Sequence, residues 1–232
     1  MKVFDELKEV IPTISVGILT ADMMNLSSQL ELIESTGVRI LHFDIMDGRF
    51  WPKITVGPSF VRGIKTTMFK DVHLLVEQPE NHIEDFAEAG ADMITFAVES
   101  CGDIARTLRR ISQMKNANEP ARGILKGVSL NPSTPVDVIC PVIDDVDIVL
   151  LLAVSPDAAG QNFIAQLPDK ITGLRNIKED VLIFVDGAVK KNNITEVAAM
   201  GPDVIITGSA VFDGKAPKDN ARFMLEAVGK KL

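Results

Sequence analysis

Eight short runs of β-branched and other apolar residues recur along the chain at fairly even spacing. Each run is nearly continuously apolar, which favours strands covered on both faces, as in a parallel sheet. The runs are Thr13–Leu19, Val38–Asp44, Asp71–Val76, Asp92–Val98, Leu125–Leu130, Val146–Val154, Val181–Gly187 and Asp203–Ser209.

Segments with helical spacing lie between these runs. After the first run, Leu26, Leu30 and Ile33 share one helical face, and Gly37 supplies a stop signal. Later segments, including PSFVRGIKTTM and PVDVICPVIDDV, continue the alternation and are also expected to be helices.

Eight strand–helix units in 232 residues predict a (β/α)8 TIM barrel of the α/β class. We expect a single domain over residues 1–232, in which residues 1–11 form an N-terminal extension before the first strand. A doubly wound open sheet is the main alternative. No G-x-G-x-x-G follows the first run, so that alternative lacks the dinucleotide-binding fingerprint.

Charge and hydropathy narrow the partners and the compartment. The net charge of −8 argues against a nucleic-acid partner, which normally needs a basic face. No stretch reaches about 18 apolar residues, so no transmembrane helix or membrane partner is expected. The first residues, MKVFDELKEV, do not resemble a signal peptide. Cys101 and Cys140 are isolated, and we expect reduced thiols in a cytoplasmic protein.

Four side chains that commonly bind metals fall late in the predicted strands. His42 and Asp44 alternate on the second strand and therefore point to the same face. His73 lies late in the third strand, and Asp186 ends the seventh. Because barrel enzymes build their sites at the carboxyl ends of the strands, these residues can converge on one divalent ion. Two histidines and two carboxylates suit Zn²⁺, Fe²⁺, Mn²⁺ or Co²⁺ rather than Ca²⁺.

Each of these residues also has an ordinary structural interpretation. A histidine in an apolar run is more often a hydrogen-bonded core residue, and an aspartate that closes a strand is often a helix cap. The metal hypothesis depends on the coincidence that two of the three histidines fall in predicted strands, each with a carboxylate partner.

The last two strands end in small residues, at the place where barrels usually bind phosphate. These ends read DGAV (Asp186–Val189) and TGSAVF (Thr207–Phe212). Small residues allow backbone N–H groups to approach an anion closely. We therefore predict a phosphate site here.

Several motifs, in the same order, resemble the ribulose-phosphate 3-epimerase family over roughly residues 14–212. They are LHFDIMDGRFWPKITVGPSFV, DVHLLVEQPENHIEDFAEAGAD, GVSLNPSTPVDV, SPDAAGQNF, FVDGAV and VIITGSAVF. The resemblance implies a barrel of the ribulose-phosphate-binding type that epimerises a ketose phosphate at C3 through an ene-diolate. It also implies a small-molecule sugar phosphate as the partner and a homo-oligomer.

The resemblance assigns roles to individual residues. His42, Asp44, His73 and Asp186 match the positions that hold one divalent metal ion, and Asp44 and Asp186 match the acid and base. The residues expected to contact substrate or phosphate are Gly17, Met46, Asp157, Ala158, Ala159, Gly160, Gln161, Gly187, Ala188, Gly208 and Ser209.

Several of the expected substrate-contacting residues differ from the family pattern, whereas the four metal positions match it. Gly17 stands where the family usually has serine, and Ala188 replaces a glycine. The family's Pro-Gly-Phe-Gly-Gly-Gln loop is PDAAGQ here, in which Asp157 adds a carboxylate near the expected phosphate. Arg49 replaces a histidine, and two active-site methionines are replaced by Leu75 and Leu152.

Three functions remain open at this point. The default is metal-dependent epimerisation of D-ribulose 5-phosphate to D-xylulose 5-phosphate, and the enzyme alternative acts on a tetrulose or hexulose phosphate. A catalytically silent sugar-phosphate binder is favoured by Gly17, Asp157 and Ala159 but opposed by the complete metal set. A related barrel decarboxylase needs Asp-x-Lys, and Met46 stands at the lysine position, so we reject it.

Overall fold

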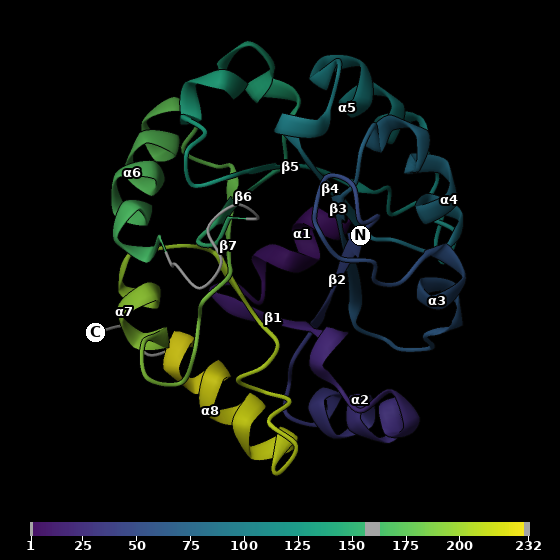
Figure 1. The fold of residues 1–232 in the computed structure, drawn as a ribbon, viewed down its shortest axis with the longest axis vertical. Helices are drawn as coiled ribbons and strands as arrows, with labels where there is room; N and C mark the ends of the chain where they lie inside the picture. Colours follow the sequence, from purple (N-terminus) through teal and green to yellow (C-terminus); the bar gives the residue numbers. More distant parts are fainter. Residues whose placement is uncertain (1, 156–162, 230–232) are drawn as a thin grey trace.

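The computed structural model describes residues 2–155 and 163–229. Eight parallel strands close into one barrel in chain order, and β8 pairs back onto β1. The helices form a ring around it (Figure 1). The prediction of a (β/α)8 barrel is confirmed. The strands are β1 (Thr13–Gly17), β2 (Ile40–Met46), β3 (Phe69–Leu75), β4 (Met93–Ala97), β5 (Leu125–Leu130), β6 (Ile148–Leu152), β7 (Leu182–Asp186) and β8 (Val204–Thr207).

Helices connect the strands, and most are short. The α-helices are α1 (Val3–Lys8), α2 (Leu26–Glu34), α3 (Pro58–Gly63), α4 (Ile83–Glu88), α5 (Ile104–Gln113), α6 (Leu167–Ile177), α7 (Ile194–Ala199) and α8 (Pro217–Gly229). The 3₁₀ helices are η1 (Ile18–Thr20), η2 (Met23–Asn25), η3 (Pro79–Asn81), η4 (Val98–Ser100), η5 (Val136–Asp145) and η6 (Ile164–Gln166).

The expected α-helix after β5 is instead the 3₁₀ helix η5, so that part of the helix prediction is wrong. Pro141 lies inside the segment. Proline has no N–H to donate, and its ring clashes with the carbonyl four residues earlier, so a regular α-helix is disfavoured here.

Strand residues divide by parity between two apolar clusters. On β6, Ile148, Leu150 and Leu152 belong to the cluster inside the barrel, while Val149 and Leu151 join the cluster beneath the helices. This alternation follows from the two-residue repeat of a strand. It explains why the strand sequences are apolar at nearly every position.

The helix α1 covers the amino-terminal end of the barrel and lies across the ring in Figure 1. Its Val3 and Leu7 are fully buried and pack with inward residues near the starts of the strands, such as Phe69 and Leu125. The opposite end, where the strands finish, is left for the predicted site. No helix in the part of the chain that the structure describes is long and apolar enough to cross a membrane.

Candidate active site

Two histidines and two aspartates meet at the carboxyl end of the barrel. His42 and Asp44 come from β2, His73 comes from β3, and Asp186 ends β7. One nitrogen or oxygen atom from each lies within 4.8 Å of the corresponding atoms of the other three. Strand parity produces this arrangement, because each of these residues shares the inward face of its strand. The structure thus brings together all four residues that the sequence singled out.

His42 is oriented by a residue that the sequence analysis missed. Its Nδ1 lies 2.7 Å from Oδ2 of Asp71 on β3, and both side chains are fully buried. Its Nε2 faces the cluster, 3.1 Å from Oδ1 of Asp44 and 4.0 Å from Oδ2 of Asp186. When the Nδ1–H donates to Asp71, the Nε2 lone pair is free to bind a cation.

His73 is oriented in the same manner from a different strand. Its Nδ1 lies 3.2 Å from Oδ1 of Asp44, and its Nε2 lies 2.9 Å from Oγ of Ser129 on β5. If Nε2–H donates to Ser129, the Nδ1 lone pair points toward Asp44 and the cluster centre. Each histidine therefore directs one nitrogen into the site and fixes the other in the barrel interior.

The four groups perturb one another's protonation. Burial by itself lowers the pKa of His42, but attraction to Asp71 and Asp44 outweighs burial and raises it well above its usual range. Burial favours a protonated Asp44, yet His42 and His73 hold the pKa of that carboxyl far below its usual range. Burial, followed by repulsion from Asp44, raises the pKa of Asp186 to about 6. Two carboxyl groups whose pKa values are driven apart are typical of an acid–base pair.

The geometry and chemistry of the cluster fit a divalent cation. Nitrogen and oxygen ligands lie about 2.1 Å from such an ion, so any two of them can be at most ~4.2 Å apart. The spread of 4.8 Å requires only a small side-chain rotation. A cation would also offset the repulsion between Asp44 and Asp186 that raises the pKa of Asp186.

A cavity of about 360 Å³ lies above the cluster. Asp44 and Asp186 reach it, whereas His42 and His73 lie beneath it with no exposed surface. Six other predicted substrate-contacting residues also line it: Gly17, Met46, Gly187, Ala188, Gly208 and Ser209. The remaining five, Asp157, Ala158, Ala159, Gly160 and Gln161, lie outside the described residues.

The loop after β2 brings two further side chains to the cavity. Asp47 organises this loop, since its carboxylate accepts the backbone N–H groups of Arg49, Phe50 and Glu77. Trp51 and Lys53 line the cavity beside Met46, although no sequence motif had marked them as site residues. Their position just after the strand that carries two predicted ligands was the available signal.

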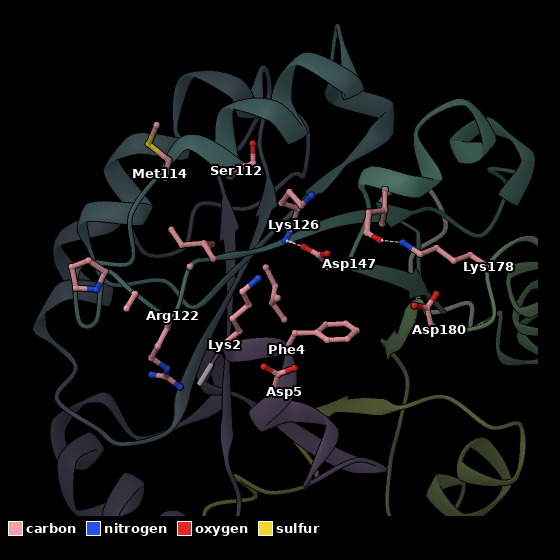
Figure 2. A pocket seen from close by; sticks show the side chains of 16 residues that line it. Lys2, Phe4, Asp5, Ser112, Met114, Arg122, Lys126, Asp147, Lys178 and Asp180 are labelled. Atoms are coloured by element: carbon pink, nitrogen blue, oxygen red, sulfur yellow. Dashed lines mark hydrogen bonds between the residues drawn. The ribbon is translucent and has the colours of Figure 1, made fainter.

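A larger cavity, of about 680 Å³, lies at the other end of the barrel beside α1 (Figure 2). Several of its charged groups already have partners. Lys178 donates to the carbonyl oxygens of Ile143 and Val146, and Arg122 makes a two-pronged ion pair with Glu6. Within the described residues, the only metal-competent group of His, Cys, Asp and Glu lies at the opposite end. The predicted metal and acid–base residues therefore lie at the smaller cavity and not at the larger one.

Comparison with known proteins agrees with this geometry. The sequence profile of the ribulose-phosphate 3 epimerase family matches residues 13–212. The chain belongs to the ribulose-phosphate 3-epimerase family. A Bacillus subtilis (strain 168) protein named ribulose-phosphate 3-epimerase is 37% identical over 222 residues, covering 93% of this chain and 97% of that protein. An Escherichia coli (strain K12) protein of the same name is 38% identical over 207 residues, covering 86% and 88%.

Solved structures show a similar fold at low sequence identity. The 3-hexulose-6-phosphate synthase of Salmonella typhimurium gives a TM-score of 0.65 at 16% identity, covering 93% of this chain and 98% of that chain. The orotidine 5'-phosphate decarboxylase of Pyrococcus horikoshii OT3 gives 0.64 at 15%, covering 94% and 100%. At these identities the likeness concerns the barrel alone.

The positions at which this chain departs from the ribulose-phosphate 3-epimerase family pattern do not all lie in the cavity. Gly17, Leu75, Leu152 and Ala188 line it. Arg49 does not, because its side chain is 74% exposed and pairs with Glu77 at 3.0 Å on the surface. The arginine thus belongs to the loop surface rather than to the substrate-contacting shell.

Proposed function

We propose that this protein is an isomerase that interconverts D-ribulose 5-phosphate and D-xylulose 5-phosphate by epimerisation at C3. The observation that carries this proposal is the pairing of Asp44 and Asp186 at one cavity floor, with two oriented histidines beneath them. The two carboxyl groups come from strands that are not neighbours, since β1 and β8 lie between β2 and β7. They can therefore approach a substrate from different sides.

The chemistry follows from these two groups. One carboxylate removes the proton from C3, and the C–H electron pair forms the C2–C3 double bond as the ketone oxygen takes up negative charge. The product of this step is a planar ene-diolate. The other carboxyl group, protonated, then delivers a proton to the opposite face of C3. The electrons of the C2–C3 double bond form the new C3–H bond, and an electron pair on the negatively charged oxygen at C2 re-forms the ketone. In the reverse direction the two groups exchange roles.

His42, Asp44, His73 and Asp186 would hold the metal ion. When bound, a divalent cation supplies positive charge next to the oxygens that become negative during proton removal. Zn²⁺, Fe²⁺, Mn²⁺ and Co²⁺ all suit two imidazoles and two carboxylates. Asp71 holds Nδ1 of His42, and Ser129 holds Nε2 of His73. These hydrogen bonds orient the other nitrogen of each histidine toward the metal position.

The test is a proton-exchange assay in deuterated water with a panel of four-, five- and six-carbon ketose phosphates. The wild type should incorporate deuterium at C3 and epimerise the pentulose phosphate fastest. Asp44→Asn and Asp186→Asn should each lower turnover by roughly a thousandfold or more, because general acid–base catalysis by one group contributes about 10²–10⁴.

Asp147→Asn is the matched control, because Asp147 lines the cavity at the other end of the barrel. Near-wild-type turnover in Asp44→Asn or Asp186→Asn would remove that residue from the mechanism. Binding of the phosphates without any exchange at C3 would instead identify a silent sugar-phosphate binder.

A further inference from the structure

A lysine from the loop after β7 reaches the loop after β8. Nζ of Lys190 donates a hydrogen bond to Oγ of Ser209, and Ser209 lines the cavity above the carboxylate pair. The contact joins the two loops that form the predicted phosphate end of the site. It therefore places an ammonium group at the rim of that end.

The backbone around Lys190 is held in an uncommon shape. Ala188 adopts φ +57°, a left-handed conformation that is unusual for any residue other than glycine, asparagine or aspartate. Asn193 stabilises it, since its Oδ1 accepts the N–H of Lys190 at 2.7 Å and its Nδ2 donates to the carbonyl of Ala188 at 3.0 Å. Strained conformations of this kind persist where the surrounding structure over-determines them, often at ligand sites.

The facing loop is built for close approach of backbone to an anion. A Cβ at Gly208 would lie 2.8 Å from the carbonyl oxygen of Gly17, so only glycine fits. The next residues turn tightly, with the N–H groups of Val211 and Phe212 both donating to the carbonyl of Gly208 at 2.9 Å. The N–H groups of Ser209 and Ala210 donate no hydrogen bond to a backbone carbonyl within the described part of the chain.

Lys190 forms no ion pair with a carboxylate among the described residues. The next lysine in sequence differs, since Nζ of Lys191 lies 3.6 Å from Oδ2 of Asp213 and also donates to Asn220. The site already contains two carboxyl groups, Asp44 and Asp186, which oppose the approach of a phosphate dianion. An ammonium group at the rim offsets part of that repulsion.

We propose that Lys190 binds the substrate phosphate directly, as a cationic clamp added to backbone donors from the two loops. The proposal deepens the proposed function and depends on it for the identity of the substrate. The ammonium exchanges its hydrogen bond with Ser209 for a charge-assisted one to a phosphate oxygen. Lys190 is thus a specificity-determining residue that favours phosphorylated over unphosphorylated sugars.

The test compares Lys190→Ala with Lys191→Ala, which removes the same charge from the neighbouring position. Because the phosphate is remote from C3, Lys190→Ala should raise KM for D-ribulose 5-phosphate about tenfold with kcat little changed. The difference from wild type should shrink at high ionic strength, since Lys190 is solvent-exposed. Lys190→Arg should recover most of the loss, and Lys191→Ala should behave as the wild type.

A second measurement does not depend on catalysis. Titration of inorganic phosphate by calorimetry should show about tenfold weaker binding to Lys190→Ala than to Lys191→Ala. Equal phosphate affinity in the two variants would overturn the assignment of Lys190. A wild type that binds phosphate through Lys190 but exchanges no proton at C3 would instead contradict only the proposed function.

Discussion

Replacing Asp71 with asparagine should weaken metal binding, although Asp71 is not itself one of the predicted metal ligands. The carboxylate lies 2.7 Å from Nδ1 of His42, and neither side chain is exposed. Asparagine has the same shape and its carbonyl oxygen can still accept the hydrogen bond, so the substitution removes mainly the negative charge. The charge raises the basicity of the imidazole that points Nε2 into the cluster.

The magnitude follows from the character of this hydrogen bond. Hydrogen bonds to charged groups contribute about 1.5–3 kcal/mol, and short buried ones are among the strong cases. Because 1.4 kcal/mol corresponds to a tenfold change in affinity, full loss of the interaction would weaken metal binding about 10- to 150-fold. Since asparagine keeps part of the hydrogen bond, we expect Asp71→Asn to weaken metal binding about ten- to thirtyfold. Ser129→Ala loses a neutral hydrogen bond to His73, of ~1 kcal/mol, and should cost about fivefold.

The assay is competition for Zn²⁺ or Mn²⁺ against a chromogenic chelator, together with melting curves recorded with and without metal. Asp147→Asn is the control, because Asp147 accepts a backbone N–H from Lys126 at 2.9 Å far from the cluster. A folded Asp71→Asn protein with the metal affinity of the control would refute an orienting role for Asp71. An equal drop in melting temperature with and without metal would show that Asp71 acts only on stability.

Two further outcomes follow from the site. Gly17→Ser should fold normally, because the backbone at Gly17 is extended (φ −71°) and a Cβ would lie 3.6 Å from Cα of Gly208, an ordinary contact. One regained hydrogen bond, worth ~1 kcal/mol, should lower KM about fivefold, and a higher KM would contradict the expected substrate contact. In chelator-treated protein, the pKa of Asp186 at about 6 exceeds its unfolded value of ~3.9, so its ionisation costs stability as pH rises through that window. Urea unfolding should show Asp186→Asn gaining stability over wild type between about pH 4 and 6, whereas a pH-independent difference would exclude this coupling.

The strand sequences predicted eight buried parallel strands and the side of each strand on which its polar residues lie. Continuous apolar runs require cover on both faces, and the two-residue repeat puts His42 and Asp44 on one face. The α-helix predicted after β5 was wrong because the prediction relied on the spacing of apolar residues and ignored Pro141. Proline has no N–H to donate, so the sequence itself contained the signal against a regular α-helix.

Side-chain contacts between different strands could not be predicted from the sequence, because they depend on how the strands pair and how the sheet curves. Asp71 meets His42 because β2 and β3 pair with these two residues opposite each other. Ser129 reaches His73 across β4, which lies between β3 and β5 in the barrel. Neither the register nor the closure of a parallel barrel follows from apolar spacing within single strands, since every inward position is compatible with several neighbours. The residue types available for a metal site were therefore readable from the sequence, and only the closed barrel decided which side chains orient them.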